Sequence, residues 1–236
     1  MSIFTTLKKI LLRQKNELLF LNRPIISKID LNLSSKNGLI KYSSDVVKFN
    51  GNNNVLMIIV GINGSINGYM NKYFWIAKKA NEIYGYTVFI FANDLMSWTN
   101  PKEFFNAIMN YIRENMVNKA EIKINIFGNS AGGSLAAFYS WEYPEIKNIL
   151  LVNPPLNDMW ELSINGLRAF TGYATLVFGQ YDPNCKVAEL FTQNEYSDIF
   201  KNIILVKGAN HEFRGMIKEF IDLPFFYLYN KVLVYV

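Results

Sequence analysis

Cysteine and histidine are almost absent from this chain of 236 residues, and each shortage excludes a class of site. The single cysteine, Cys185, cannot form a disulfide within the chain, which fits a reducing compartment and leads us to expect a cytoplasmic location. One cysteine and one histidine are too few for the usual zinc site built from nitrogen and sulfur ligands. We therefore assign no metal and no cofactor.

Long hydrophobic runs and a strong excess of charge are also lacking. No stretch reaches the roughly 18 apolar residues of a membrane span. Lys8, Lys9 and Arg13 interrupt the apolar N-terminal segment, so no signal peptide is expected. The net charge of +5 is modest and the basic residues are scattered, so no nucleic-acid partner is expected. With 50% hydrophobic residues, the chain is instead expected to form a single globular domain over 1–236.

Short apolar runs alternate with helical patterns from about residue 50 onward. A continuous apolar run, typical of a strand buried on both faces, occurs at 55–60, and further strands are predicted at 87–92, 122–127, 149–152, 175–178 and 203–206. Helical patterns lie at 69–84, which Gly85 ends, and at 101–116, which Pro101 opens. The alternation predicts an α/β fold with a mostly parallel central sheet and helices on both faces.

Other segments flank or interrupt this pattern. Residues 1–20 are predicted to form a basic amphipathic helix, and 24–50 short strands around a turn near residue 37. Residues 154–174 are interpreted as a short insertion in place of a lid. The N-terminal helix and the aromatic residues 225–227 favour packing on the domain. Peripheral contact with a membrane stays open as the alternative.

A G-x-S-x-G motif, with Ser130 between Gly128 and Gly132, joins a predicted strand to a predicted helix. Such a turn can hold a serine oxygen away from the backbone and within reach of a base. A Cβ at either glycine would clash with the neighbouring backbone, and glycine removes that clash. The alternative is that Ser130 only caps the helix that begins at Ala131.

A serine hydroxyl needs a base before it can act as a nucleophile near neutral pH. The only histidine, His211, directly follows the last predicted strand, at the sheet edge where ligands bind in parallel sheets. Asp182 directly follows the preceding strand and is preferred as the partner of His211, with Asp158 as the rival. The order Ser130, Asp182, His211 therefore predicts a catalytic triad.

The segments GNSAGG (128–133), VFGQYDP (177–183) and GANH (208–211) resemble the α/β-hydrolase superfamily, and the resemblance covers about residues 50–222. It implies a compact serine hydrolase, similar to carboxylesterases, that forms an acyl-enzyme.

The same resemblance implies an oxyanion hole. Its donors are the N–H of Ala131, after the nucleophile, and that of Ile62, where Gly61 lets the backbone approach closely. Many relatives carry His-Gly where this chain has Val60-Gly61. That departure argues against membership of the HGGG group of esterases.

The sequence leaves the substrate open. A small-molecule ester and an acylated glycan or peptide both fit, because the same machinery cleaves esters, thioesters and amides. Two alternatives belong to other classes: a membrane-associated acyl hydrolase or transferase, and a non-catalytic binding protein with the α/β-hydrolase fold.

Overall fold

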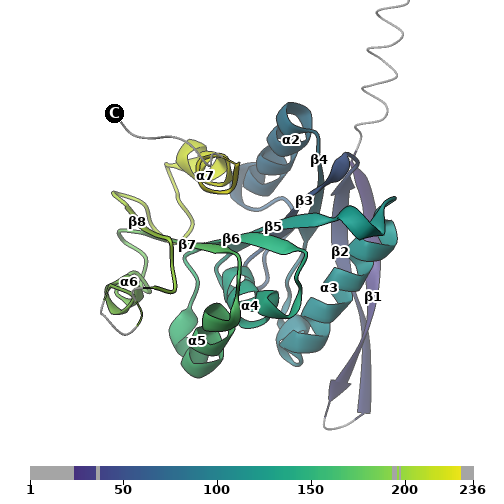
Figure 1. Ribbon diagram of the computed structural model, residues 1–236, viewed down its shortest axis with the longest axis horizontal. Coiled ribbons are helices and arrows are strands. Elements are labelled where there is room, and N and C mark those ends of the chain that lie inside the picture. Colours follow the sequence, from purple (N-terminus) through teal and green to yellow (C-terminus); the bar gives the residue numbers. More distant parts are fainter. Residues whose placement is uncertain (1–23, 36–37, 193–195, 197, 230–236) are drawn as a thin grey trace, which may run out of the picture.

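A computed structural model describes residues 24–35, 38–192, 196 and 198–229, and in this part of the chain the strands form an eight-stranded sheet (Figure 1). The strands are β1 (Ile25–Ser35), β2 (Gly38–Phe49), β3 (Asn52–Ile59), β4 (Tyr86–Phe91), β5 (Lys123–Asn129), β6 (Ile146–Val152), β7 (Tyr173–Gly179) and β8 (Asn202–Val206). Their order across the sheet is β1-β2-β4-β3-β5-β6-β7-β8. The helix predicted over 1–20 lies outside the described residues.

The sheet is parallel from β4 to β8, and only the pairings of β1 with β2 and of β2 with β4 are antiparallel. This arrangement confirms the predicted mostly parallel α/β fold. β3 lies between β4 and β5 although it precedes both in sequence. The chain thus reverses its direction of travel across the sheet near β3 and β5, and such a reversal opens a crevice at the carboxyl ends of the strands.

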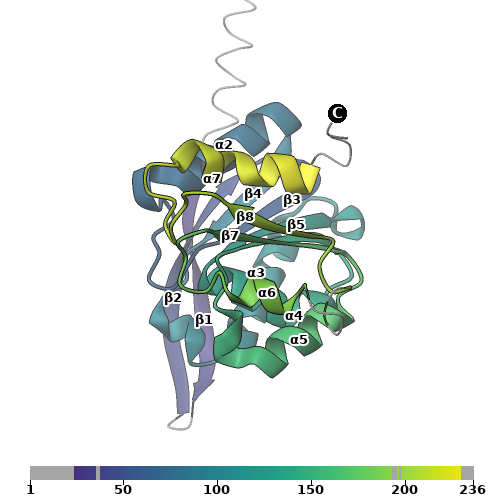
Figure 2. The ribbon, with the colours of Figure 1, turned by 90° about the vertical axis from the view of Figure 1, so that its left-hand side faces the viewer.

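Helices cover both faces of this sheet, as Figures 1 and 2 show. α2 (Lys72–Tyr84) and α7 (Ile217–Pro224) lie on one face. The other face carries α3 (Pro101–Asn115), α4 (Ala131–Tyr139), α5 (Trp160–Ala169) and the short α6 (Val187–Leu190). α2 ends at Gly85, which has a φ of 67° that glycine adopts without strain.

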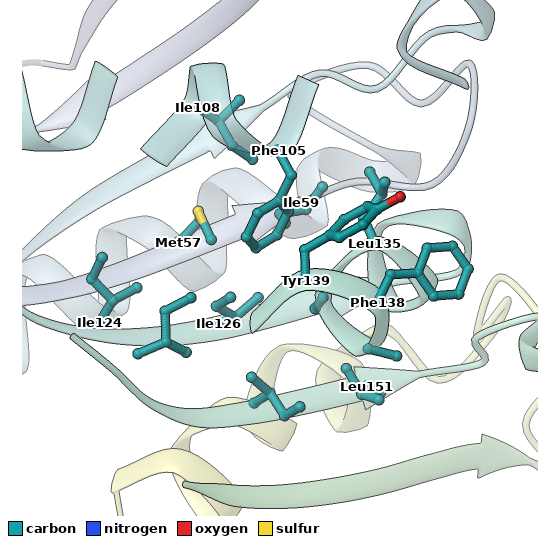
Figure 3. Close-up of a cluster of buried hydrophobic side chains, with 14 of the residues drawn as sticks. Met57, Ile59, Phe105, Ile108, Ile124, Ile126, Leu135, Phe138, Tyr139 and Leu151 are labelled. Carbon is teal, nitrogen blue, oxygen red and sulfur yellow. The ribbon is translucent and has the colours of Figure 1, made fainter. Parts of the chain in front are cut away.

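Successive side chains along a strand point to opposite faces of the sheet. The core is therefore divided into two hydrophobic clusters, one on each face. On β3, Met57 and Ile59 point toward α3 and α4, where Figure 3 shows them packed with Phe105 and Leu135. The intervening Ile58 belongs to the cluster under α2 and α7. Strands buried on both faces read as continuous apolar runs for this reason.

Two elements differ from the sequence-based expectation. The predicted short strands over 24–50 are strands of 11 and 12 residues, paired in register from Ile25 to Ser35. The segment 154–174 is not a separate insertion, because it contains α5, the crossover helix between the parallel neighbours β6 and β7. A Cβ at Gly166 of α5 would lie 2.2 Å from the Ala137 carbonyl oxygen, so α5 crosses α4 in close contact.

Candidate active site

Ser130 lies at the turn between β5 and α4 with φ 51° and ψ −126°, a conformation that a residue with a Cβ rarely adopts. Its N–H donates to the Val152 carbonyl oxygen at 2.7 Å, and its own carbonyl accepts from the N–H of Gly133 at 2.8 Å. The Ser130 hydroxyl does not cap α4. The alternative that Ser130 is merely a capping residue therefore fails, and the side chain is available to other partners.

The two glycines of the motif permit the close approach of α4 to the strands. A Cβ on Gly128 would lie 2.7 Å from the Gly132 carbonyl oxygen, and one on Gly132 would lie 2.2 Å from the Ile59 carbonyl oxygen. Both distances are shorter than nonbonded carbon and oxygen atoms tolerate, and the clashing atoms are backbone. The sequence therefore needs glycine on both sides of Ser130 to keep α4 against β3 and β5.

The structure brings the three residues of the predicted triad together. His211 Nε2 lies 3.0 Å from Ser130 Oγ, and His211 Nδ1 is hydrogen-bonded to Asp182 Oδ2. The carboxylate at His211 is thus the preferred Asp182. The rival Asp158 lies in the 3-10 helix η5 (Leu156–Met159).

Burial differs sharply within this triplet. Asp182 is only 2% exposed, whereas the His211 side chain is 39% exposed. The second oxygen of Asp182 accepts the Asn184 N–H at 2.7 Å, so both carboxylate oxygens have partners. A buried carboxylate with two hydrogen bonds can fix the orientation of the imidazole. The rest of the half-exposed ring stays accessible to a ligand.

Asn153 holds the loops around this histidine in place. It directly follows β6, is completely buried and has a φ of 50°. Its amide donates to the His211 carbonyl oxygen at 2.9 Å, and its side-chain oxygen accepts the Gly179 N–H at 2.8 Å. No motif marks Asn153. Its place at the carboxyl end of a buried strand is the one sequence signal that could have identified it.

The loop after β3 lies against Ser130. A Cβ on Gly61 would lie 3.1 Å from Ser130 Cβ, and the loop turns through a hydrogen bond from the Gly64 N–H to the Gly61 carbonyl at 2.8 Å. The buried Asn93 supports this loop by donating to the Val60 carbonyl at 3.1 Å. Asn93 thus supports the loop, which begins with Val60-Gly61 and has no histidine there.

The predicted oxyanion donors flank Ser130 from two sides. Ala131 is the first residue of α4, and Ile62 is in the adjacent loop after β3. In the part of the chain that the structure describes, neither N–H has a hydrogen-bond partner. Neither N–H is therefore committed to another group of the described chain.

Tyr73 of α2 links the two loops that meet at Ser130. Its hydroxyl accepts a hydrogen bond from the Asn129 amide at 3.0 Å, and the Gly61 N–H also faces this oxygen. Burial raises the pKa of Tyr73 well above its ordinary value, against the smaller opposing effects of Gly61 and Asn129. The phenol is therefore neutral at physiological pH and acts as a positioning group.

A pocket of about 250 Å³ opens over these residues. Its lining includes Ser130, His211, Gly61, Ile62, Tyr69 and Lys72. A second hollow of about 320 Å³ lies at the opposite edge of the sheet, beside Asn148 and Thr175, and includes neither Ser130 nor His211. The smaller pocket is the functional candidate because it alone of these two is lined by Ser130 and His211.

The described residues contain neither a metal-binding cluster nor a membrane-spanning helix. In this part of the chain, no three histidine, cysteine, aspartate or glutamate side chains are grouped so as to hold a metal ion. None of the helices described here combines the length and the apolar character needed to span a bilayer.

The sequence matches no protein-family model and no curated protein, but many solved structures resemble it. Est1E from Butyrivibrio proteoclasticus aligns with a TM-score of 0.59 at 14% identity, over 82% of this chain and 95% of that chain. Dienelactone hydrolase from Anabaena variabilis gives 0.59 at 14% identity, over 86% and 98%. Alpha/beta hydrolase domain-containing protein 10 from mouse gives 0.55 at 12% identity, over 84% and 96%.

This chain has the α/β-hydrolase fold. The resemblance drawn from the segments around Ser130, Asp182 and His211 is confirmed at the level of the fold. In this chain the three residues follow β5, β7 and β8 respectively, so they lie at the carboxyl ends of parallel strands.

Proposed function

We propose that this chain is a serine hydrolase that cleaves a carboxylic ester through an acyl-enzyme on Ser130. One observation carries the proposal: His211 lies between Ser130 Oγ, at 3.0 Å from Nε2, and the buried Asp182 carboxylate. With Nδ1–H donating to Asp182, the lone pair of Nε2 faces the serine hydroxyl. This arrangement suits general-base activation of a hydroxyl.

Acylation begins when Ser130 Oγ attacks the carbonyl carbon of the ester and His211 Nε2 accepts the hydroxyl proton. The carbonyl double bond becomes a single bond, and its oxygen takes up the negative charge. Asp182 stabilises the imidazolium through its hydrogen bond to Nδ1–H. The intermediate then collapses, the bond to the alcohol oxygen breaks, and His211 returns the proton to the departing alcohol.

The negative oxygen of this intermediate would bind to the N–H groups of Ala131 and Ile62. Such donors are worth about 3 kcal/mol each in known hydrolases because they are oriented before the charge develops. Asn93 and Tyr73 hold the loop that carries Ile62, through Val60 and Gly61 respectively. Deacylation repeats the same steps with water in place of the serine hydroxyl.

The nature of the substrate is also part of the proposal. The pocket is open, which suits a small-molecule ester or an acyl group on a glycan or peptide. The esterase domain from Rhodothermus marinus, which has a similar fold, is named as an esterase, and this favours the ester over the thioester or amide. A cytoplasmic location is proposed on the strength of the single cysteine.

Labelling by a fluorophosphonate probe tests the proposal directly. The wild-type protein should take up one probe, and Ser130→Ala should take up none and lose hydrolysis of nitrophenyl esters by about 10⁴-fold or more. Ser134→Ala is the matched control, because Ser134 is a buried serine one turn further along α4. Comparable hydrolysis by Ser130→Ala would refute the assignment. Absence of labelling and hydrolysis in the wild type would favour the non-catalytic alternative.

A further inference from the structure

Lys72 is a buried cation in the pocket of Ser130. It is the first residue of α2 and only 4% exposed, and it lines the same hollow as Ser130 and His211. Lysine is almost never buried to this extent unless it is paired. The contacts of its ammonium group therefore indicate whether Lys72 has a structural or a ligand-binding role.

These partners leave the ammonium group only partly satisfied. Nζ donates to the Glu212 carbonyl oxygen at the long distance of 3.5 Å and lies 4.0 Å from the centroid of the Phe220 ring. An ammonium group has three N–H donors, so two remain for other acceptors. Within the described residues no carboxylate lies within ion-pair distance of Lys72 Nζ, and the nearby Glu212 is paired with Arg214.

The surroundings of Lys72 oppose its positive charge. Burial lowers the pKa of Lys72 to about 8, and Glu212 only partly counteracts this effect. The first turn of α2 contains no acidic residue, and its amino-terminal end carries the positive end of the helix dipole. An anion entering the pocket would relieve both unfavourable effects at once.

We propose that Lys72 binds an anionic group, a carboxylate or a phosphate, on the ester that Ser130 cleaves. The inference rests on the proposed function and narrows its substrate class to small esters that carry a negative charge. A desolvated ammonium group with free donors attracts an anion more strongly than an exposed lysine does. Lys72 is thus a specificity-determining residue, and the pocket of about 250 Å³ holds the scissile bond and the charge together.

Matched pairs of esters test the preference for charge. In the first pair, 4-acetoxybenzoate carries a carboxylate on its leaving group and 4-acetoxybenzamide is the neutral counterpart. In the second pair, monophenyl adipate carries the carboxylate on its acyl group and phenyl hexanoate is the neutral counterpart. 4-Acetoxyphenyl phosphate against phenyl acetate tests the phosphate. At pH 7 the wild type should prefer the charged ester in at least one pair, by tenfold or more in kcat/KM.

Substitutions then assign this preference to one residue. Lys72→Gln and Lys72→Met should each lower the charged-to-neutral ratio of kcat/KM at least tenfold. Lys78→Gln should leave the ratio unchanged, because it removes the same charge from a half-buried position on α2 outside the pocket, where Lys78 pairs with Glu82. The inference is overturned if no pair shows a preference. It is also overturned if the Lys72 variants slow both esters of a pair equally, which would indicate a purely structural role.

A binding measurement separates this inference from the proposed function. Calorimetry on Ser130→Ala protein should show that Lys72→Gln weakens binding of the preferred charged ester at least tenfold, while Lys78→Gln does not. Equal affinity in the Lys72→Gln protein would refute the anion site even if the enzyme hydrolyses esters. If the wild type neither hydrolyses an ester nor takes up fluorophosphonate, the proposed function fails, and titration of the three charged esters still decides whether Lys72 binds an anion.

Discussion

Ser130 is held in a strained conformation by hydrogen bonds on both sides, from its N–H to Val152 and from Gly133 to its carbonyl. A non-glycine residue in such a region costs on the order of 1–3 kcal/mol. The surrounding hydrogen bonds offset this cost, and the turn places the hydroxyl 3.0 Å from His211 Nε2. Alanine at this position would keep the strain and lose the hydroxyl, whereas glycine would lose both.

Ser130→Gly should therefore be inactive and more stable than Ser130→Ala. We expect a difference of about 1 kcal/mol in the free energy of unfolding, because glycine relieves the strain but loses more entropy on folding. Urea denaturation measures it. Ser134→Gly is the control and should destabilise, since glycine within a helix costs about 1 kcal/mol. Equal stability of the two Ser130 variants would mean that the turn stores no strain.

Lys72 should make stability depend on pH in an alkaline window. Burial lowers its pKa from 10.5 to about 8, with Glu212 opposing the shift. The other titratable groups that line the same pocket are His211, Tyr69 and Tyr73. Between these two values the unfolded chain binds more protons than the folded one, so this group makes stability rise as the pH rises. Below pH 8 the folded state carries the full cost of the buried charge.

Lys72→Met should consequently stabilise the protein at pH 7. A shift of this size corresponds to about 3 kcal/mol, and loss of the contact with the Phe220 ring reduces the expected gain to about 2 kcal/mol. The gain should shrink as the pH approaches 10.5, and Lys78→Met should show no such trend. Thermal denaturation across this range measures both variants. A Lys72→Met protein less stable than the wild type at pH 7 would contradict the account.

At the scale of elements, the site depends on hydrogen bonds that connect the carboxyl ends of β6 and β7 to the loop after β8. β6, β7 and the loop after β8 meet at Asn153, whose side chain bonds Gly179 and the His211 carbonyl. Neither partner is a neighbour of Asn153 in sequence. The position of His211 relative to Ser130 is thus fixed by an element that contributes no reacting atom.

Asn153→Ala should loosen this connection. Removing the amide leaves a buried N–H and a carbonyl without partners, and alanine is less favourable than asparagine at a φ of 50°. We expect a loss of about 3 kcal/mol in stability and a fall in kcat larger than any change in KM. Asn202→Ala is the control, because Asn202 is an exposed residue at the start of β8, at the opposite edge of the sheet. Unchanged kcat in Asn153→Ala would show that His211 is positioned by other contacts.

The elements that could be predicted from sequence are those with a strong local pattern. β3 contains the continuous apolar run 55–59, Gly85 ends α2, and Pro101 opens α3. The order of the strands and the role of α5 could not be predicted, because they depend on contacts between distant segments, such as Gly166 against Ala137.

The same limit applies to the site residues. Ser130, Asp182 and His211 stand in motifs or directly after strands, so the sequence points to them. Asn93, Tyr73 and Lys72 act through partners far away in the chain, at Val60, Asn129 and Glu212, and no local pattern marks them. Their polar side chains could be assigned only after the fold had placed them around the pocket.

At the scale of the whole molecule, the proposed site exists only in the folded chain. Its groups follow β3, β5, β7 and β8, from Gly61 to His211, and the pairing of Ile59 with Gly128 sets the loop of Ile62 beside the turn of Ser130. A reagent bound covalently to Ser130 and held by groups from several strands would therefore stabilise the entire sheet.

A phosphonate bound covalently to Ser130 should resemble the tetrahedral intermediate. We expect its free phosphoryl oxygen to lie about 3 Å from the N–H groups of both Ala131 and Ile62, because neither group has another partner in the described part of the chain. The adduct should raise the melting temperature, since it binds the folded state alone. A crystal structure of the adduct and a thermal scan measure the two effects, with the unreactive Ser130→Ala protein as the control for the scan. If groups other than these two hold the oxygen, the assignment of Ile62 fails, and the loop after β3 then has only the role of closing the pocket.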